Sequence, residues 1–284
     1  MEDAASYVSR LEGLATRFVT PAGAGSVVWR SWGEGPPLAL LHGASGSWTH
    51  WIRNILPLAA RFRVLVPDMP GFGDSDAPPE PHTADGLADL LAASLDVMLP
   101  PPARFDLAGF SFGGIIGGLV AARLGRRIST LVLLGTGGLG LPPGSPRRLA
   151  RIESAMSPEA IRGVHRANLL TLMLAGPESA DDLAVSLQIE NLRRSRFKSG
   201  TIPQSDVLLR ALPAIRARIA AIWGEHDAFT DGRLDECRRV LASAQPDLDL
   251  RVIEGAGHWV TYEAADRVNA ALFELLTRRA LDPG

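Results

Sequence analysis

Short apolar runs alternate with longer stretches of helical periodicity along most of the chain. The runs predicted to be strands begin near Leu38, Val64, Phe105, Thr130, Ile219 and Leu250. Stretches predicted to be helices separate most of these runs, at 51–60, 84–98, 114–124, 234–242 and 263–279. This alternation predicts an α/β fold, with a mostly parallel sheet and helices on both of its faces. In such a sheet, ligands bind at the carboxyl ends of the strands.

An antiparallel hairpin is predicted ahead of these strands. Residues 17–20 and 27–30 each read as a strand, and they flank a turn rich in glycine and alanine at 22–25. Together with the later runs, the hairpin gives a sheet of about eight strands.

The alternation stops between about residues 138 and 204. A linker rich in proline and glycine opens this segment, and helical patterns follow at 158–175 and 179–194. We therefore expect a core domain made of 1–137 and 205–284, with 138–204 inserted as a helical cap over the strand ends. A cap at that place would exclude water and supply most of a substrate pocket. The alternative is an insertion with a purely structural role.

Composition narrows the class of protein. The chain has 284 residues, 46% of them hydrophobic, and a net charge of −2, so it has no strongly basic surface for nucleic acid. Its one cysteine, Cys237, excludes an internal disulfide and a cysteine-based metal cluster. The first residues do not have the pattern of a signal peptide, and no stretch approaches about 18 uncharged apolar residues. We expect a cytoplasmic protein without nucleic-acid or membrane partners. A mature exported chain would have the same sequence features. The composition does not decide between a monomer and a homo-oligomer.

The pentapeptide GFSFG at 109–113 is the clearest chemical signal. It lies between an apolar run that ends at Ala108 and a helical stretch that starts at Gly114. A strand that turns sharply into a helix strains its middle residue, and glycines on either side leave room for that geometry. The strain would expose the hydroxyl of Ser111 at the amino end of the helix, where free amides and the helix dipole gather. Ser111 is therefore our candidate nucleophile.

A base and an acid follow in the order that a hydrolytic triad requires. Asp227 comes after the predicted strand near Ile219, and His258 comes after the one near Leu250. The order Ser111, Asp227, His258 matches that of α/β-hydrolase triads. In this interpretation, His258 accepts the proton of Ser111, and Asp227 fixes the tautomer of His258. Asp231, or less readily Glu225, is the alternative acid if the loop is placed differently.

The strand near Leu38 is followed by the glycine-containing loop HGASGS at 42–47. A loop at this position can bring a backbone amide beside the nucleophile. We assign an oxyanion hole to the amides of Ala44 and Phe112, each typically worth roughly 3 kcal/mol of barrier.

These segments together resemble the α/β-hydrolase family. The matching pieces are LLHGASGS, DMPGFGDSD, GFSFGG, WGEHDAF and GAGHW, and they extend from about residue 16 to the end of the chain. The resemblance implies the fold described above, a lid in the segment 138–204 and a loop-orienting role for His42.

Other candidate sites have weaker support. His50, His82, His165 and His226 lack partners at ligand spacing, so we expect no metal, and no cofactor is implied. The glycine motif at 135–140 lacks the helix that a dinucleotide site needs, because prolines follow it directly.

A basic run in the expected cap has two interpretations. Arg193, Arg194, Arg196 and Lys198 either form a solvated face, or one arginine grips a substrate carboxylate. We name Arg193 and Arg194 as candidate substrate contacts.

Within the family, the chain resembles the hydrolases of aromatic meta-cleavage products, which split a carbon–carbon bond in diketo acids. The segment 48–55, the His258–Trp259 pair and a cap arginine carry this resemblance. Phe110 and His50 stand where those enzymes usually carry asparagines, and the loop at 44–46 lacks their Gly-Pro-Gly. His50, Phe110 and Trp259 are nevertheless candidate substrate contacts.

The two missing asparagines favour a different or less polar acyl group. We therefore expect a serine hydrolase that cleaves a small-molecule ester or related acyl compound through an acyl-enzyme. Carbon–carbon bond hydrolysis is the first alternative. A cofactor-free haloperoxidase or perhydrolase, or a non-catalytic small-molecule receptor on the same fold, is the second.

Overall fold

The structure is a computed structural model that describes residues 2–142, 144–145 and 147–277. Its strands are β1 Thr16–Ala22, β2 Gly25–Trp32, β3 Pro37–Leu41, β4 Arg63–Asp68, β5 Phe105–Phe110, β6 Ile128–Leu134, β7 Arg218–Gly224 and β8 Asp249–Ile253. Its α-helices are α1 Ala4–Gly13, α2 Ile55–Ala59, α3 Ala84–Met98, α4 Phe112–Leu124, α5 Pro158–Leu172, α6 Asp182–Arg193, α7 Val207–Ala211, α8 Leu234–Ala244, α9 Val260–Glu263 and α10 Ala265–Thr277.

All eight strands form a single sheet in the order β1-β2-β4-β3-β5-β6-β7-β8. β1 pairs with β2 antiparallel, as the hairpin pattern predicted, and β2 pairs with β4 antiparallel. Every other pairing in the sheet is parallel. The predicted α/β fold with a mostly parallel sheet of about eight strands is therefore confirmed.

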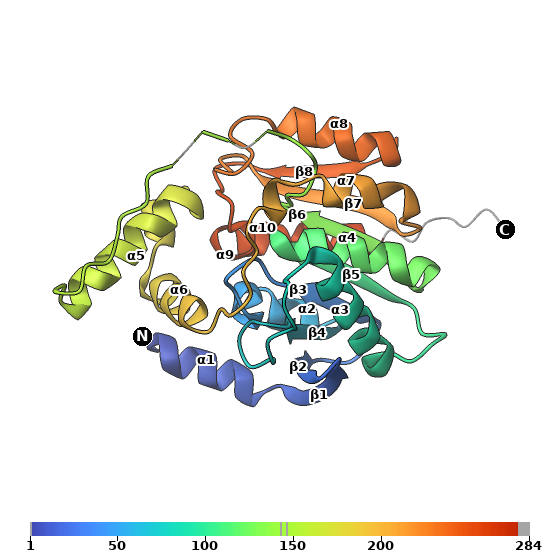
Figure 1. Ribbon diagram of the computed structural model, residues 1–284, viewed down its shortest axis with the longest axis horizontal. Coiled ribbons are helices and arrows are strands. Elements are labelled where there is room, and N and C mark those ends of the chain that lie inside the picture. Colours follow the sequence, from blue (N-terminus) through green and yellow to red (C-terminus); the bar gives the residue numbers. More distant parts are fainter. Residues whose placement is uncertain (1, 143, 146, 278–284) are drawn as a thin grey trace.

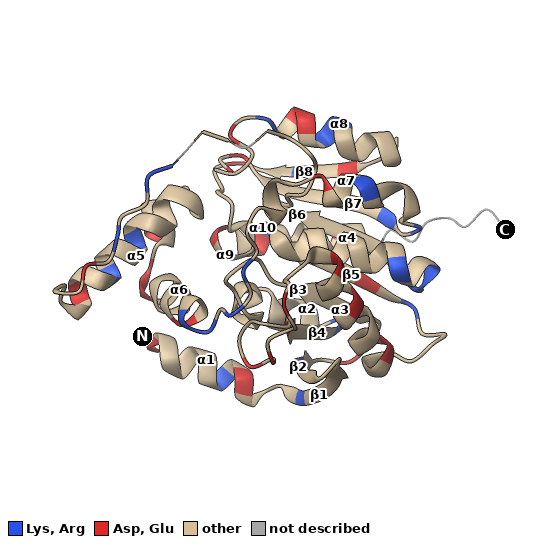
Figure 2. Ribbon diagram, viewed as in Figure 1, with Lys and Arg blue, Asp and Glu red and all other residues tan. Residues whose placement is uncertain are grey.

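Helices cover both faces of the sheet (Figure 1). Alternate residues of each central strand point to opposite faces, so Leu131 and Leu133 of β6 join one core while Val132 and Leu134 join the other. The first core packs beneath α3, α4 and α8, and the second beneath α2 and α10. β3 and β6 carry no charged residue, and acidic and basic residues are spread over the outer helices and loops (Figure 2).

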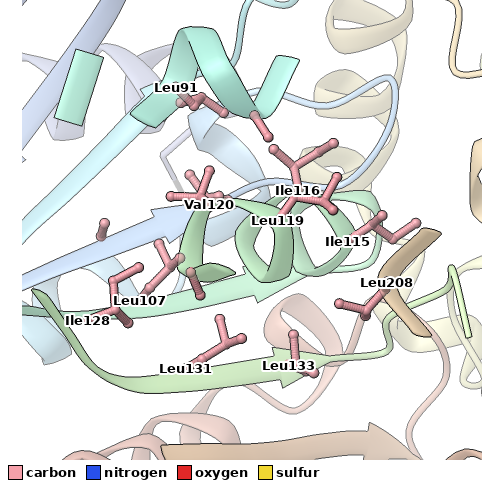
Figure 3. Packing of buried hydrophobic residues seen from close by; sticks show 14 of the residues in the cluster. Leu91, Leu107, Ile115, Ile116, Leu119, Val120, Ile128, Leu131, Leu133 and Leu208 are labelled. Carbon is pink, nitrogen blue, oxygen red and sulfur yellow. The ribbon is translucent and has the colours of Figure 1, made fainter. Parts of the chain in front are cut away.

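Helix α4 is central to this arrangement. Its residues from Phe112 to Ala121 are all buried, so the helix is apolar on every side rather than amphipathic. Ile116 and Val120 lie on the side of α4 that faces the neighbouring helix α3, whereas Ile115 points toward α7 (Figure 3). Leu208 of α7 packs close to the same helix (Figure 3). The helix that begins directly after Ser111 is thus held from both sides.

Between β6 and β7 the chain leaves the sheet. α5 and α6 lie to one side of it, where they contact each other, and α6 also contacts α1 (Figure 1). Ser157 caps the amino end of α5 and Asp181 caps that of α6, which sets where both helices begin. The cap at Asp181 explains why α6 begins later than the predicted 179. α5 ends at Leu172, before the predicted 175.

Other elements also differ from the sequence-based expectation. The helix expected at 51–60 is divided into a 3-10 turn, Trp48–Trp51, and the short helix α2. The helix expected at 263–279 is preceded by α9, and its last residues lie outside the described part of the chain. Helix α1 was not predicted, because Leu11 is its only buried residue. No helix among the described residues is long and apolar enough to cross a membrane.

Candidate active site

Ser111 lies at the sharp turn between β5 and α4. Its φ of 54° is rare for a residue other than glycine, and its amide donates to the carbonyl of Leu134 at 2.7 Å. A Cβ on Gly113 would lie 2.4 Å from the carbonyl oxygen of Leu41, and one on Gly109 would lie 2.3 Å from that of Gly113. Only glycine fits at both positions, so the turn has the geometry expected from the sequence.

His258 links Ser111 to Asp227. The Nε2 atom of His258 lies 2.9 Å from Oγ of Ser111, and its Nδ1 atom lies 2.8 Å from Oδ2 of Asp227. Asp227 and His258 are both 3% exposed. The other oxygen of Asp227, Oδ1, accepts the amide hydrogen of Phe229 at 2.8 Å. An alcohol, an imidazole and a carboxylate from three distant parts of the chain are therefore in hydrogen-bonding contact.

The two alternative acids face elsewhere. Asp231 accepts hydrogen bonds from the amide and the hydroxyl of Ser145, both at 2.9 Å. Glu225 accepts the amide hydrogen of Gly255 at 2.8 Å. Asp227 is thus the carboxylate that contacts His258.

The loop after β3 is organised by a buried histidine. The amide of Met69 donates to Nε2 of His42 at 2.9 Å, so Nδ1 carries the proton and donates to the carbonyl of Gly43 at 2.8 Å. Burial lowers the pKa of His42, which agrees with this neutral form. The next residue of the loop, Ala44, lines the same cavity as Ser111 and Phe112.

His50 comes from the 3-10 turn that follows the loop. Its Nδ1 atom accepts the amide hydrogen of Gly43 at 3.2 Å, which leaves the proton on Nε2. Burial lowers the pKa of His50 well below its usual range, and repulsion from His42 or His258 in their protonated forms acts in the same direction. His50 is therefore a neutral imidazole whose remaining polar group is a donor.

A cavity of about 460 Å³ lies over Ser111. Its lining includes Ala44, His50, Phe110, Ser111, Phe112, Leu139, Leu172, Met173, Phe229 and His258. Arg147 and Arg233 also line it, whereas no Asp or Glu belongs to the described part of its wall. The cavity is mostly apolar near the nucleophile and carries only positive charge elsewhere.

The predicted substrate contacts divide into two groups. His50 and Phe110 line the cavity, but Trp259 does not, because its buried ring donates through Nε1 to the carbonyl of His50 at 3.1 Å. Arg193 pairs with Glu190 of its own helix at 2.7 Å, and Arg194 pairs with Asp74. Neither arginine belongs to the cavity lining, and both are paired with acidic residues, so the arrangement favours the solvated face of the two interpretations.

Sequence reasoning missed several cavity residues. Phe229 follows Asp227 by two residues, and its ring lies 4.3 Å from that of His258 between centroids. Arg147 and Arg233 come from segments without a recognisable motif. Phe229 lies shortly after the end of a predicted strand, and this position could have suggested it as a cavity residue. No sequence motif near Arg147 or Arg233 indicates that they line the cavity.

Within the described ranges, no group of three or more His, Cys, Asp or Glu side chains is arranged to hold a metal ion. Cys237 lines the cavity, but burial raises the pKa of its thiol to about 11, so the thiol is protonated at neutral pH.

Comparisons with known proteins show the family of the chain. A family model described as "Alpha/beta hydrolase family" matches residues 38–271. A 2-hydroxy-6-oxo-6-phenylhexa-2,4-dienoate hydrolase from Burkholderia cepacia is 29% identical over 86% of this chain and 88% of its own length. A 2-hydroxy-6-oxononadienedioate/2-hydroxy-6-oxononatrienedioate hydrolase from Comamonas testosteroni is 27% identical, with the same coverage. The structure of a thermophilic esterase from Thermogutta terrifontis has a TM-score of 0.67 and 25% identity, covering 92% of this chain and 98% of that one.

Proposed function

The chain belongs to the alpha/beta hydrolase family, and on that premise we propose that it is a serine hydrolase of a small carboxylic ester or related acyl compound. The hydrogen-bonded series Ser111–His258–Asp227, with contacts of 2.9 Å and 2.8 Å, is the observation that carries this proposal. The relatives of this chain include a dienoate hydrolase and an esterase, and both support hydrolysis as the general class of reaction.

In the proposed reaction, Oγ of Ser111 attacks the substrate carbonyl while Nε2 of His258 takes the hydroxyl proton. Asp227 accepts the hydrogen of Nδ1, which keeps the lone pair of Nε2 facing Ser111 and stabilises the imidazolium. His258 then returns the proton to the leaving alcohol. Water, activated by the same imidazole, releases the acid from the acyl-enzyme.

The amides of Ala44 and Phe112 would bind the negative oxygen of the tetrahedral intermediate. Both residues line the cavity beside Ser111, and neither amide has a hydrogen-bond partner among the described residues. Phe112 is also the first residue of α4, where the helix dipole favours negative charge. These features support an oxyanion hole at this position.

We propose further that the segment 138–204 acts as a cap and that 1–137 with 205–284 form the core domain. Leu139 and Met173 from this segment line the cavity, so it contributes to the pocket of a small-molecule substrate. The mostly apolar wall suits an acyl group of modest polarity, and Nε2 of His50 can donate to a second oxygen of the substrate.

The test combines covalent labelling with turnover. We expect a fluorophosphonate probe to label the wild-type protein on Ser111, and the protein to hydrolyse p-nitrophenyl acetate or butyrate. Ser111→Ala should abolish labelling, and Ser111→Ala or His258→Ala should lower kcat by about 10⁴-fold or more. Unchanged turnover in Ser111→Ala would refute the proposal.

Carbon–carbon bond hydrolysis is the second candidate, because the chain resembles the meta-cleavage product hydrolases and the Burkholderia cepacia and Comamonas testosteroni relatives are named as hydrolases of 2-hydroxy-6-oxo dienoates. The same Ser111 and His258 would serve both reactions. A panel of esters of increasing acyl length, assayed beside one meta-cleavage dienoate, separates the two candidates by their kcat/KM values.

A further inference from the structure

Glu263, the last residue of α9, holds together two parts of the chain that are far apart in sequence. Its Oε1 atom accepts the amide hydrogens of Ala175 at 2.9 Å and Gly176 at 2.7 Å. Its Oε2 atom accepts the amide hydrogen of Gly257 at 2.6 Å and shares that of Ala175, at 3.1 Å. Ala175 and Gly176 follow helix α5, whereas Gly257 directly precedes His258.

Backbone amides satisfy this carboxylate, and no cation among the described residues pairs with it. Hydrogen bonds from amides to a carboxylate are charge-assisted, and they are shorter and stronger than those to a neutral acceptor. They also fix direction, because each amide must point at the carboxylate. The side chain therefore fixes the relative position of two backbone segments.

The two segments also touch directly. The amide of Trp259 donates to the carbonyl of Met173 at 2.6 Å. A Cβ on Gly257 would lie 2.8 Å from the amide nitrogen of Ala175. The residues on both sides of His258 are thus bound to the stretch 173–176, one through Glu263 and the other through the backbone.

One of these segments carries the proposed base, and the other forms part of the cavity wall. Met173 lines the cavity, as does Leu172 at the end of α5. Helix α9 follows directly after Trp259, and its first turn brings Glu263 back over the loop that holds His258, with its amide donating to the carbonyl of Trp259 at 3.0 Å. A shift of Glu263 would therefore move the imidazole and the cavity wall together.

We propose that Glu263 is a positioning residue that couples the cavity wall at 173–176 to the orientation of His258. This inference rests on the proposed function, since it gives His258 the role of base. Glu263 does not touch substrate in this role. It keeps Nε2 of His258 within reach of Ser111 only while the wall segment is in place.

The variant Glu263→Gln separates the two sides of the carboxylate. A glutamine has one acceptor oxygen, which we expect at the Oε1 position, where Gly176 donates and where the shared amide of Ala175 has its shorter contact, 2.9 Å against 3.1 Å. Its amide group would then point at the N–H of Gly257, where two donors cannot bond. The cavity wall should stay in place while the His258 loop loosens.

Kinetics can detect this separation. For Glu263→Gln we expect kcat to fall roughly ten- to a hundredfold, as for a small misplacement of a catalytic group, with KM changed less than about threefold. Glu263→Ala removes the bonds from all three amides, so kcat should fall and KM should also rise more than about fivefold. Hydrogen exchange should show loss of protection at the Gly257 amide in both variants, and at Gly176 in Glu263→Ala alone.

Two controls separate positioning from simple loss of stability. All rates are divided by the concentration of reactive Ser111, counted by fluorophosphonate titration, so unfolded protein does not contribute. Asp266→Asn removes a nearby carboxylate that makes no hydrogen bond or ion pair among those the structure gives, and it should match wild type in kcat and KM.

The possible outcomes are distinguishable. Titrated kcat within about twofold of wild type in Glu263→Gln, with only a lower melting temperature, would show a merely structural residue and overturn the inference while leaving the proposed function intact. Wild-type protein that the probe does not label at Ser111 would overturn both.

Discussion

The two carboxylate oxygens of Asp227 have different hydrogen-bond partners. Oδ2 faces Nδ1 of His258 at 2.8 Å, while Oδ1 accepts the amide hydrogen of Phe229 at 2.8 Å. The Phe229 amide thus prevents the carboxylate from rotating. Asp231 lies four residues later, with a φ of 48°, and its side chain bonds to Ser145. A difference in backbone direction, and not in chemistry, distinguishes these two aspartates.

This arrangement predicts the effect of Asp227→Asn. The amide oxygen should keep the bond from Phe229, which places the NH₂ group against Nδ1 of His258. Nε2 would then carry the proton and could not accept one from Ser111, so kcat should fall by about 10⁴-fold, as in chymotrypsin. The matched variant Asp231→Asn suits its left-handed backbone and should keep kcat within about threefold of wild type, as expected for a surface position. Equal losses in the two variants would contradict the assignment of Asp227.

At the scale of elements, α4 holds Ser111 through packing on all sides. Leu208 of α7 is fully buried, and a Cβ on Gly118 would lie 2.2 Å from its Cδ1 atom. α7 lies just beyond the segment proposed as the cap, so this contact fixes where the chain rejoins the core (Figure 3). Two stretches that are distant in sequence are thus joined through one leucine.

The contact can be tested by Leu208→Ala. A buried leucine that is shortened to alanine leaves a cavity, and we expect a loss of about 3 kcal/mol in the free energy of unfolding. Leu170→Ala on α5, where the side chain is 37% exposed, should cost less than about 1 kcal/mol. Urea denaturation of the two variants measures both values. A loss below that of Leu170→Ala would show that α7 is not an anchor of α4.

At the scale of the whole molecule, a buried charge cluster joins the segment 138–204 to the sheet. Arg30 of β2, with its side chain 2% exposed, bonds to Asp68 at 3.0 Å and also to Asp74. Asp74 pairs in turn with Arg194 at the end of α6. Burial tends to raise the pKa of Asp74, but the hydrogen bonds and charges of Arg30 and Arg194 outweigh it, so the pKa is lowered overall.

Two adjacent arginines make a matched pair of tests. Arg194→Met should lower the free energy of unfolding by about 1 kcal/mol at neutral pH, the upper end for a partly exposed pair. Arg193→Met, which removes only a solvent-exposed contact within α6, should leave the free energy of unfolding nearly unchanged. Thermal unfolding at several pH values measures both.

The pH dependence follows from the lowered pKa of Asp74. The folded state favours the ionised carboxylate, so the pair contributes fully above the unfolded pKa of about 4 and less as pH falls through the folded pKa. The difference between Arg194→Met and wild type should therefore shrink below about pH 4. A difference that grows at low pH would contradict the ion pair.

Much of the fold follows from local sequence pattern. The period of apolar residues predicted the parallel sheet, and the predicted bounds of α3 agree with the structure, because an amphipathic helix with a threonine cap is determined by its own residues. The turn at Ser111 was also predictable, because a side chain at position 109 or 113 would collide with the surrounding backbone and only glycine avoids this. The order of Ser111, Asp227 and His258 along the chain likewise predicted which three side chains form the candidate triad.

What the sequence by itself left open depends on contacts between distant residues. Arg193 and Arg194 read alike along the chain, yet they pair with Glu190 and Asp74 and do not belong to the cavity lining, which includes Arg147 and Arg233 instead. The choice of acid beside His258 and the bonds that Glu263 makes were likewise decided by tertiary structure alone. Side-chain direction there depends on which partner the folded chain brings within about 3 Å, and no local pattern records that distance.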